Sequence, residues 1–351
     1  MLRVGMVSPP WLQVPPPGYG GIERVVYDLT ERLVKRKNKV LLFAPGGSKT
    51  SAKLIPYVPE PLGQDWPGHI KDLFFKLCSK YSFTRAVYEK VDIIHDHTLH
   101  NTDLPVNVVY TLHGPASKFL VSKCREMSKN KRAYFVAISN RQKELYGQGI
   151  NFAGVVHNGI NTKNIPFKEK KSDYLFFIGR ANWEKGLDLA VRAAVKSGMK
   201  LVMAIKMTEK FEQRFFKEKV QPWLTRYKRS NSFKLLGEIT PKKKFQLYKN
   251  AKATLFTSQW EEPFGLVIIE SMACGTPVLA LQRGAAVEVI KDWKTGFVVR
   301  SEDEMIEAIR RIDEIDPKEC RRHAEKNFSV EKMAREYEKI YKKILASRKD
   351  G

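Results

Sequence analysis

Two glutamates in one stretch, residues 261–277, carry the clearest chemical signal in the chain. The stretch opens as an acidic turn, is expected to be helical from 264 to 273, and ends in Gly-Thr-Pro, which stops a helix. At a rise of about 1.5 Å per residue, Glu262 and Glu270 lie roughly 12 Å apart. The free backbone N–H groups at the helix start form an anion site. This spacing suits one carboxylate at a sugar and another at a ribose, with a diphosphate between them.

A simpler explanation of the pair is structural. Glu262 would then merely favour the helix dipole, and Glu270 would be a solvated helix residue. Glu270, however, stands among apolar neighbours: Val267, Ile268, Ile269, Met272 and Ala273. A carboxylate in such surroundings costs free energy unless it is paired. The sequence therefore favours a specific role for Glu270.

Two cations, Arg180 and Lys185, follow a predicted strand over 174–179. In open α/β sheets, ligands bind outside the carboxyl ends of the strands. An arginine can hold a phosphate through two hydrogen bonds, and a lysine adds a point charge. Taken alone, such residues would more often be surface charges in a chain this basic. Their position after a strand favours an anion site.

A glycine-rich loop follows the first predicted strand and leads into a helix that begins near Ile22. Gly18, Gly20 and Gly21 let the backbone approach a ligand closely. The pattern is not Gly-x-Gly-x-x-Gly, so it does not predict binding of a nicotinamide dinucleotide. The alternative is an ordinary flexible surface loop.

Histidines cluster in the first half of the chain, at positions 95, 97, 100 and 113. His113 follows a predicted strand over 107–112, where it can contact a sugar hydroxyl or orient an acceptor. His95 is interpreted as a packed strand residue and His97 as a residue near a cleft. A His-x-His pattern with a third histidine also suits a metal site, a weaker alternative because the spacing lacks diagnostic context.

Short apolar runs alternate with longer amphipathic stretches along the chain. The predicted strands span 2–8, 39–44, 92–96, 107–112, 134–138, 153–157, 174–179, 200–205, 233–236, 253–257 and 278–281. The predicted helices span 22–37, 69–90, 117–129, 140–148, 186–197, 209–228, 241–250, 264–273, 284–290 and 330–346, with more helix after 300. This alternation predicts an α/β fold with parallel sheets.

The chain has 351 residues, which exceeds one ordinary domain and suits two. A charge run over 168–173 marks the boundary between them. We therefore expect a Rossmann-like domain over 1–165, a second over 166–329, and a C-terminal helix over 330–351.

The composition excludes several classes of protein. Hydrophobic residues make up 43% and aromatic residues 11%, which excludes a mostly disordered chain. No apolar run approaches the roughly 18 residues of a membrane span, and the N-terminus enters a strand without a signal peptide. Four widely spaced cysteines suit reduced thiols, so a cytoplasmic protein is expected.

The net charge of +24 is the outlier of the composition. A field of this sign attracts nucleic acid, anionic lipid headgroups or phosphorylated substrates. Cations gather within 206–249 and within 118–132, and the second group also contains Phe119, Leu120 and Val121. A basic amphipathic helix can lie on anionic lipid, so a peripheral contact with the inner face of the cell membrane is one interpretation. The other is a solvated, lysine-rich surface.

The motifs, taken in order, resemble those of family 4 of the retaining glycosyltransferases, the group 1 glycosyltransferases with the GT-B fold. The two glutamates with Pro-Phe-Gly-Leu between them, followed by Met-Ala-Cys-Gly-Thr-Pro-Val, carry most of the resemblance. The glycine loop, Gly179-Arg180 with Lys185-Gly186, and the segments 284–290 and 295–299 match as well. The resemblance implies two Rossmann-like domains facing across a cleft, with the C-terminal helix crossing back to the first.

The resemblance also implies an activity. It is a retaining, metal-independent transfer of a hexose-type sugar from a nucleotide-sugar donor, UDP- or GDP-linked, to an acceptor hydroxyl. Catalytic roles fall to His113, Arg180, Lys185 and Glu262. Donor-binding roles fall to Gly20, Gly21, Phe264, Gly265, Leu266 and Glu270. No metal or cofactor is implied, and no Asp-x-Asp sequence occurs in the chain.

Within that reaction, Glu270 would hold the ribose and Glu262 the hydroxyls of the donor sugar. Arg180 and Lys185 would neutralise the leaving diphosphate. The expected partners are a nucleotide-sugar donor and a carbohydrate or lipid-linked acceptor, without specific nucleic acid. The expected setting is cell-envelope polysaccharide or glycolipid synthesis.

Two departures from the family pattern bear on the donor sugar. The turn Arg283-Gly284-Ala285-Ala286 replaces a common Gly-Gly, and Trp293 stands where a glycine is common. Three alternatives stay open: a phosphorylase, a nucleotide-sugar epimerase, or a polyanion-binding protein on a glycosyltransferase-like scaffold. The order of the motifs argues against the first two, and no aromatic-basic RNA motif supports the third.

Overall fold

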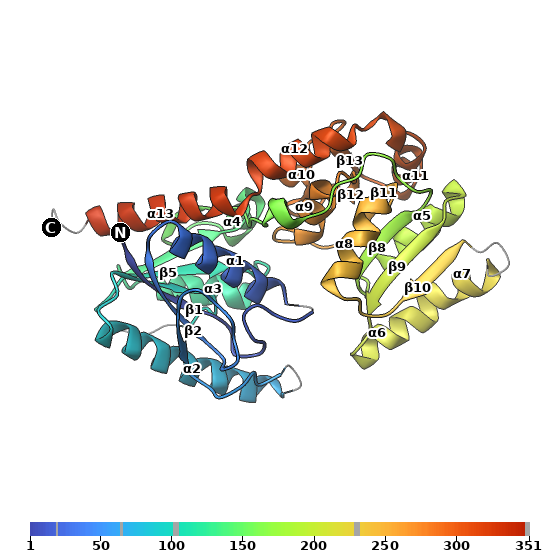
Figure 1. The fold of residues 1–351 in the computed structure, drawn as a ribbon. Helices are drawn as coiled ribbons and strands as arrows, with labels where there is room; N and C mark the ends of the chain where they lie inside the picture. The colour runs from blue at the N-terminus through green and yellow to red at the C-terminus, as the bar shows by residue number, and fades with distance from the viewer. Residues whose placement is uncertain (19, 64–65, 101–104, 228–231, 348–351) are drawn as a thin grey trace. The chain divides into compact units, whose positions relative to one another are not determined.

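The computed structural model describes residues 1–18, 20–63, 66–100, 105–227 and 232–347. The chain divides into two compact units, Met1–Ile160 with Ser329–Gly351, and Asn161–Phe328 (Figure 1). The first boundary thus falls after Ile160 rather than after 165, and the C-terminal segment belongs to the first unit. Tyr19 of the glycine loop, and Lys228 and Arg229 of one basic group, lie outside the described residues.

The first unit is built on a seven-stranded parallel sheet with the order β3-β2-β1-β4-β5-β6-β7. Its strands are β1 (Arg3–Val7), β2 (Lys39–Ala44), β3 (Lys53–Pro56), β4 (Ile93–Asp96), β5 (Val108–Leu112), β6 (Ala133–Ala137) and β7 (Phe152–Val155). Its helices are α1 (Gly21–Lys35), α2 (Gly68–Tyr88), α3 (Lys118–Met127), α4 (Asn140–Tyr146) and α13 (Val330–Ala346). The central strands β4 and β5 are buried throughout because helices flank the sheet.

The C-terminal helix α13 completes the core of the first unit. Its tyrosines lie on the buried face of the helix. The hydroxyl of Tyr341 lies 2.7 Å from Nδ1 of His95, and that of Tyr337 lies 2.8 Å from Oγ1 of Thr111. A segment far away in the sequence therefore supplies hydrogen-bond partners to the central strands β4 and β5.

The second unit is built on a six-stranded parallel sheet with the order β10-β9-β8-β11-β12-β13. Its strands are β8 (Leu175–Arg180), β9 (Leu201–Lys206), β10 (Phe233–Leu236), β11 (Ala253–Phe256), β12 (Val278–Leu281) and β13 (Gly296–Val299). Its helices are α5 (Leu187–Ser197), α6 (Lys210–Phe215), α7 (Gln221–Arg226), α8 (Pro241–Asn250), α9 (Leu266–Ala273), α10 (Ala286–Val289), α11 (Glu302–Arg310) and α12 (Pro317–Asn327). The predicted parallel α/β architecture is confirmed in both units.

The structure differs from the sequence prediction at a few elements. The edge strands β3 and β13 were not predicted; the apolar pattern of β3 is weak because Ile55 is its single buried residue. The predicted helix over 209–228 consists of α6, a π-helical stretch over Phe216–Val220, and α7. Pro222 lies in the first turn of α7, and a proline cannot continue a helix because it lacks the N–H group.

Among the described helices, none is long and apolar enough to cross a bilayer. Cys78, Cys124, Cys274 and Cys320 are all unpaired and buried. Burial raises the pKa of Cys124 and of Cys274 to about 12, so both thiols stay protonated and serve as packing groups.

Candidate functional site

The candidate site of the second unit lies at the carboxyl ends of β8 and β11, which are neighbouring parallel strands. Arg180 is the last residue of β8, and Lys185 follows in the loop before α5. The loop after β11 carries Glu262 and leads to α9. The backbone N–H of Gln259 donates to the carbonyl of Glu184 at 2.7 Å, so the two loops are in contact. The fold therefore brings together Lys185 and Glu262, which are distant in sequence.

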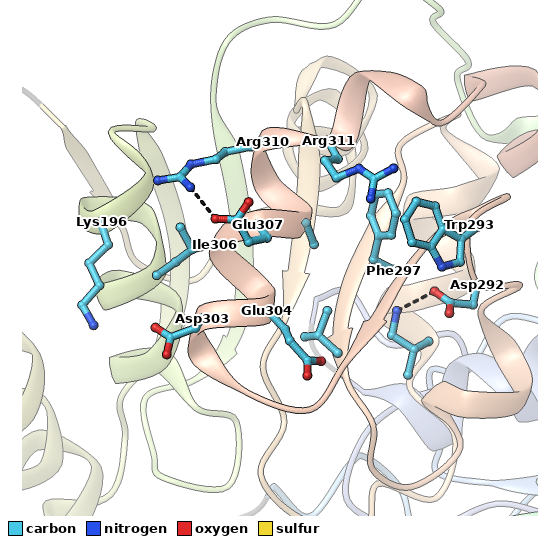
Figure 2. Close-up of a pocket in the computed structure, with 13 residues that line it drawn as sticks. Lys196, Asp292, Trp293, Phe297, Asp303, Glu304, Ile306, Glu307, Arg310 and Arg311 are labelled. Carbon is cyan, nitrogen blue, oxygen red and sulfur yellow. Dashed lines mark hydrogen bonds and ion pairs between the residues drawn. The ribbon is translucent and has the colours of Figure 1, made fainter.

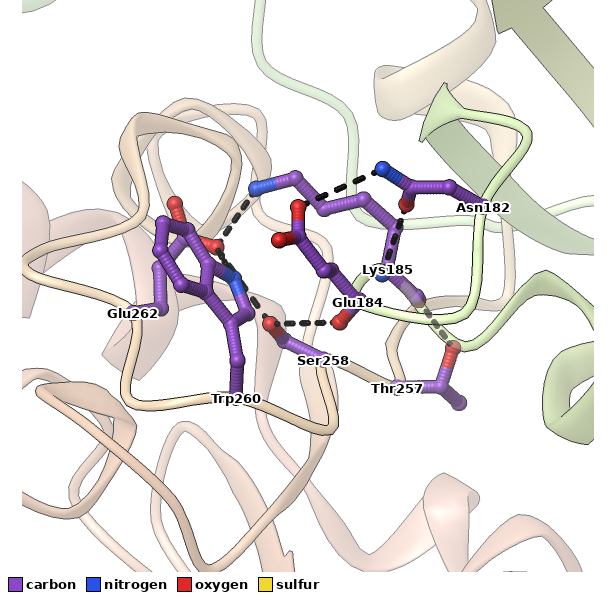
Figure 3. A network of polar contacts seen from close by, with 7 residues as sticks. All are labelled: Asn182, Glu184, Lys185, Thr257, Ser258, Trp260 and Glu262. Atoms are coloured by element: carbon purple, nitrogen blue, oxygen red, sulfur yellow. Dashed lines mark hydrogen bonds and ion pairs between the residues drawn. The ribbon is translucent and has the colours of Figure 1, made fainter. Parts of the chain in front are cut away.

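Lys185 and Glu262 form an ion pair at the centre of this site (Figure 3). Nζ of Lys185 lies 2.5 Å from Oε2 of Glu262. The same oxygen accepts hydrogen bonds from Nε1 of Trp260 at 2.7 Å and from Oγ of Ser258 at 3.3 Å. The carboxylate is thus held by three donors, whereas the lysine side chain remains 26% exposed. Lys185 is placed to meet a bound anion.

Two glycines allow the loops to approach each other this closely. Gly186 has a φ of +64°, and a Cβ there would lie 2.0 Å from the carbonyl oxygen of Thr257. Gly284 has a φ of +55°, and a Cβ there would lie 2.4 Å from the backbone nitrogen of Glu262. Larger residues would force apart the loops that carry Lys185 and Glu262.

Arg180 is positioned by a carboxylate that the sequence did not reveal. Its Nε lies 2.5 Å from Oε1 of Glu212, whose side chain is fully buried. The other oxygen of Glu212 accepts the backbone N–H groups of Thr208 and Glu209, at 3.0 Å each. The side chain of Arg180 is 37% exposed. One nitrogen of Arg180 is therefore engaged by the protein, and the two terminal nitrogens face no acceptor among the described residues.

The helix start predicted near residue 264 is observed at Leu266, with Gly265 as the preceding cap. Gly265 has a φ of +87°, and a Cβ there would lie 3.0 Å from the ring of Phe256. Phe264 is only 2% exposed, with its ring 6.0 Å from that of Phe328. Phe264 can therefore contribute to a ligand site only through its backbone.

Glu270 is buried and paired, as its apolar neighbours in the sequence require. Its Oε1 lies 2.5 Å from Nζ of Lys244 in α8, and its Oε2 accepts a hydrogen bond from the hydroxyl of Tyr248 at 3.3 Å. Each of the two motif glutamates thus has its own lysine partner. Both lysines come from segments that are distant from the motif in the sequence.

The first unit holds a chain of histidines at the ends of β4 and β5. His97 Nδ1 lies 2.8 Å from His113 Nε2, and the two rings are stacked. The other ring nitrogen of His97 lies 3.2 Å from the sulfur of Met6. His95 is fully buried, as the packed-strand interpretation expected, and hydrogen-bonds to Thr111. The ring nitrogens of these histidines therefore find their polar contacts within the cluster and in the surrounding core.

Burial controls the protonation of this cluster. Desolvation lowers the pKa of His113 to about 4 and that of His95 to about 3. The pKa of His97 is held well below its usual value by burial and by its histidine neighbours. The cluster is therefore uncharged near neutral pH.

The glycine loop precedes α1, also in the first unit. Gly20 caps the helix with a φ of +150°, and a Cβ there would lie 2.8 Å from the side chain of Pro16. Gly21 is exposed as the first helical residue. In the first turn of α1, burial raises the pKa of Glu23 to about 7. His113, Gly20 and Gly21 thus belong to the first unit, and the other seven predicted site residues belong to the second.

The metal alternative finds no ligand set in the part of the chain that the structure describes. No group of three histidine, cysteine, aspartate or glutamate side chains there is placed to hold a metal ion. The histidines engage each other, Thr111 and Tyr341 instead.

A separate hollow of about 720 Å³ lies between α11 and β13 of the second unit, and none of the predicted site residues lines it (Figure 2). Trp293 at its edge has a φ of +62°, which explains why a glycine is favoured at this position. Its ring packs 4.9 Å from Phe297 and lies 4.3 Å from the guanidinium of Arg311. These contacts compensate for the strained backbone.

Two family models cover almost the whole chain. One, described as glycosyl transferases group 1, matches residues 160–329, and the other, described as Glycosyltransferase Family 4, matches residues 19–164. The chain belongs to the group 1 glycosyltransferases.

This glycosyltransferase is similar to an uncharacterized glycosyltransferase of Methanocaldococcus jannaschii, at 23% identity over 76% of this chain and 80% of the relative. Its fold is that of a sucrose-phosphate synthase from Thermosynechococcus elongatus, with a TM-score of 0.79, 19% identity, and coverage of 99% and 100% of the two chains. It also matches Anabaena HepE in complex with UDP and glucose, with a TM-score of 0.72, 20% identity, and coverage of 98% and 100%. The GT-B fold is thereby shown.

Several curated relatives of this glycosyltransferase are matched over only part of their length. The matched segment spans 37% of the glycogen synthase of Mycobacterium tuberculosis and 47% of a probable sucrose-phosphate synthase of Thermosipho melanesiensis. This chain therefore shares the family and the fold with these relatives. Their substrates are properties of those proteins.

Sequence reasoning missed three groups that shape the glycosyltransferase's site: Glu212, Lys244 and Trp260. Trp260 lies two residues before Glu262, so its proximity to the motif was a usable signal. Glu212 shows locally only as a helix-capping glutamate, and its bond to Arg180 spans 32 positions. Lys244 is one of three consecutive lysines, and nothing in the sequence separates it from its neighbours.

Proposed function

We propose that this glycosyltransferase transfers a hexose-type sugar from a nucleotide-sugar donor to an acceptor hydroxyl, with retention of configuration and without a metal ion. The observation that carries the proposal is the cluster at the ends of β8 and β11. Two partly exposed cations, Arg180 and Lys185, stand there with Glu262. Cations held in place before the reaction stabilise the negative charge that develops on a leaving diphosphate.

Residues of the second unit bind three parts of the donor: the diphosphate, the sugar and the ribose. Arg180 and Lys185 hold the diphosphate, with the backbone N–H groups that follow Gly265 at the start of α9. Glu262 accepts hydrogen bonds from hydroxyls of the donor sugar, and Glu270 from the ribose. HepE, which has the same fold, was crystallised with UDP and glucose. That complex supports a nucleotide-sugar donor for this chain, UDP- or GDP-linked.

The chemistry requires no covalent attachment to the enzyme. The bond between the anomeric carbon and the diphosphate oxygen breaks, and the acceptor oxygen forms the new bond on the same face of the sugar. The departing phosphate oxygen takes the acceptor proton, so charge and protons balance. His113 contributes at the sugar-ring region as a neutral imidazole, while Gly20 and Gly21 contribute backbone contacts to the donor.

The broader setting of the reaction is also a proposal. We assign the enzyme to cell-envelope polysaccharide or glycolipid synthesis at the cytoplasmic face of the cell membrane. One fold neighbour is a lipopolysaccharide outer core galactosyltransferase, and one relative is a human phosphatidylinositol N-acetylglucosaminyltransferase subunit. Both names concern acceptors of this kind, and the net charge of +24 suits an anionic surface.

The first test is thermal stability in the presence of UDP-, GDP- and ADP-sugars, with and without EDTA. Specific binding stabilises the protein by mass action, about 2.7 kcal/mol at one hundred times the Kd. A shift with one nucleotide class, insensitive to EDTA and lost in Arg180→Ala, is expected. The matched control Arg300→Ala, an exposed arginine that bonds to Gln282, should keep the shift.

Two further outcomes decide the proposal. Once the donor is known, the anomeric configuration of the product, compared with that of the donor by NMR, tests retention. A folded protein that no sugar nucleotide stabilises would overturn the transferase proposal. Salt-sensitive nucleic-acid binding that survives Glu270→Ala would then favour the polyanion-binding alternative.

A further inference from the structure

The helix α2 of the first unit exposes an unusual number of large apolar side chains. Leu73, Leu77 and Tyr81 follow one another at intervals of four residues and therefore share one face of the helix. They are 50%, 55% and 47% exposed, and Tyr88, which continues the stripe, is 74% exposed. Two leucines and two tyrosines on one face exceed the scattered apolar residues of an ordinary surface.

The opposite face of α2 is also apolar, and it packs into the core. Phe83 and Ala86 belong to the hydrophobic core around the sheet, and Cys78, Ser79 and Ser82 are buried on the same side of the helix. An ordinary surface helix is apolar on its buried face and polar on the other. Because one apolar face already anchors α2, the exposed stripe is not needed to fold the first unit.

Aromatic residues stand at both ends of the exposed stripe. Trp66 precedes the helix, is 42% exposed, and packs edge-on against Phe74 at 5.4 Å. Tyr88 ends the helix with the guanidinium of Arg85 4.9 Å from its ring. Tryptophan and tyrosine carry an apolar ring and a polar group, a combination that suits the boundary between lipid and water.

Lysines outnumber the single acidic residue of α2, Asp72, beside the stripe. Lys76 and Lys80 are exposed on α2 beside Leu73 and Leu77. Neither lysine has an ion-pair partner among the described residues, unlike Lys53 and Arg85, which both bond to Glu89. An apolar stripe with unpaired lysines along one border is complementary to a surface that is apolar inside and anionic outside.

We propose that the exposed face of α2, defined by Trp66, Leu73, Leu77, Tyr81 and Tyr88, docks the enzyme on an anionic lipid surface. The helix lies along the membrane rather than across it, since no described helix can span a bilayer. A second copy of the chain is a poorer occupant, because an antiparallel pairing of two α2 faces would bring Lys76 and Lys80 against the same unpaired lysines. An anionic headgroup layer neutralises them instead.

This assignment differs from the two basic groups that the sequence suggested. Within 206–249, the exposed large apolar residues are Phe211 and Leu235, which lie in different elements. Within 118–132, Phe119 is exposed, whereas Leu120 and Val121 pack against the core. The density of lysines is thus a poorer guide to a lipid-binding face than exposed apolar area beside a few unpaired cations.

The test is sedimentation of the full chain with vesicles of phosphatidylcholine alone, or containing about 30% phosphatidylglycerol. Binding to the anionic vesicles is expected, weakening as salt rises from about 0.1 M to about 0.5 M. Leu73→Gln/Leu77→Gln should weaken partitioning by about tenfold or more, since the buried leucine area is lost. Lys76→Gln/Lys80→Gln should weaken binding to anionic vesicles by about tenfold.

Matched control variants distinguish binding through this face from nonspecific binding of the protein to vesicles. Leu145→Gln removes an exposed leucine in α4, and Lys326→Gln/Lys342→Gln removes two exposed lysines elsewhere; both should bind within about twofold of the wild type. Wild-type protein that ignores anionic vesicles, or α2 variants that bind them like wild type, would overturn the proposal. A dimer in solution that Leu73→Gln/Leu77→Gln dissolves would assign the face to a second copy instead.

The inference relies on the proposed function only for its cellular setting. The α2 variants should keep the donor-induced rise in melting temperature, because the donor residues of the second unit are untouched. Loss of vesicle binding with intact donor binding tests the docking face alone. Loss of donor binding with intact vesicle binding tests the proposed function alone.

Discussion

The two units of this glycosyltransferase hold their candidate residues in electrostatically opposite ways. In the second unit, Lys185 and Glu262, and likewise Lys244 and Glu270, are ion pairs at 2.5 Å. In the first unit, His113 is a neutral imidazole that is kept uncharged by burial. The candidate residues of the second unit are thus charged and paired, whereas His113 of the first unit is uncharged.

The difference shows which task each arrangement suits. A lysine paired with a glutamate is already fixed in position, so it can exchange part of that contact for a phosphate without large reorganisation. A neutral, hydrogen-bonded imidazole can meet sugar hydroxyls as donor or acceptor without attracting the diphosphate. The second unit therefore suits the charged part of a donor, and the first suits uncharged hydroxyl groups.

The largest expected effect comes from removing a cation of the second unit. Arg180→Ala should lower kcat/KM for sugar transfer by about 100- to 1000-fold, because the variant lacks the fixed guanidinium that stabilises negative charge on the leaving diphosphate. Steady-state kinetics measure this, with Arg300→Ala as the control. If kcat/KM of the variant were within threefold of the wild-type value, the charged cluster would have no part in the mechanism.

The neutral cluster is tested by pH. The pKa of His113 is about 4 in the folded protein against about 6.5 in the unfolded chain. The unfolded state therefore takes up this proton first on acidification, and stability contributed by neutral His113 is lost as the pH falls from about 6.5 toward 4. The His113→Gln variant lacks this loss. The difference in free energy of unfolding between variant and wild type should therefore shift in favour of the variant by about 1 to 2 kcal/mol when the pH is lowered from 7.5 to 5.

Thermal or urea unfolding at several pH values measures that gain. The control is His69→Gln, which changes an exposed histidine at the start of α2. Its difference from wild type should stay constant between pH 7.5 and 5. A constant difference for His113→Gln as well would mean that the folded protein does not lower the pKa of His113, and the contrast between the units would fail.

The assignment of Glu270 to the ribose makes a narrower prediction. Glu270→Gln should raise the Kd of the nucleoside diphosphate by about tenfold, because a charged hydrogen-bond acceptor is lost. It should leave the Kd of pyrophosphate, which has no ribose, within about twofold. Calorimetry on both ligands measures this, with the exposed Glu307→Gln as control. Equal weakening of both ligands would place Glu270 at the phosphates instead.

The smallest effect concerns positioning. Glu212 holds Nε of Arg180, so Glu212→Gln should lower kcat/KM by about fivefold while keeping one oxygen for the backbone of α6. In an Arg180→Ala background the same change should have no further effect on kcat/KM, as expected for a residue that acts through Arg180. Additive losses in the double variant would show that Glu212 acts independently.

The sequence predicted most of the fold for a physical reason. Runs such as 40–44, apolar at consecutive positions, are typical of strands buried on both faces, and their alternation with amphipathic stretches indicates parallel sheets. The prediction failed at particular elements: the edge strands β3 and β13 were missed, β3 having a single buried residue, and Pro222 interrupts an otherwise helical pattern. At the site, the motif residues and their positions after strands were readable in the sequence, and the partners of those residues were not.

The sequence by itself thus determined the family, the two parallel sheets and the identity of the charged motif residues, because these depend on periodicity and on short-range spacing. The tertiary structure decided that Lys185 neutralises Glu262, that Glu212 holds Arg180, and that His113 is uncharged. Each of these depends on burial or on contact between segments distant in the chain. Burial and long-range contact set the electrostatics of a site, and no local pattern of residues encodes them.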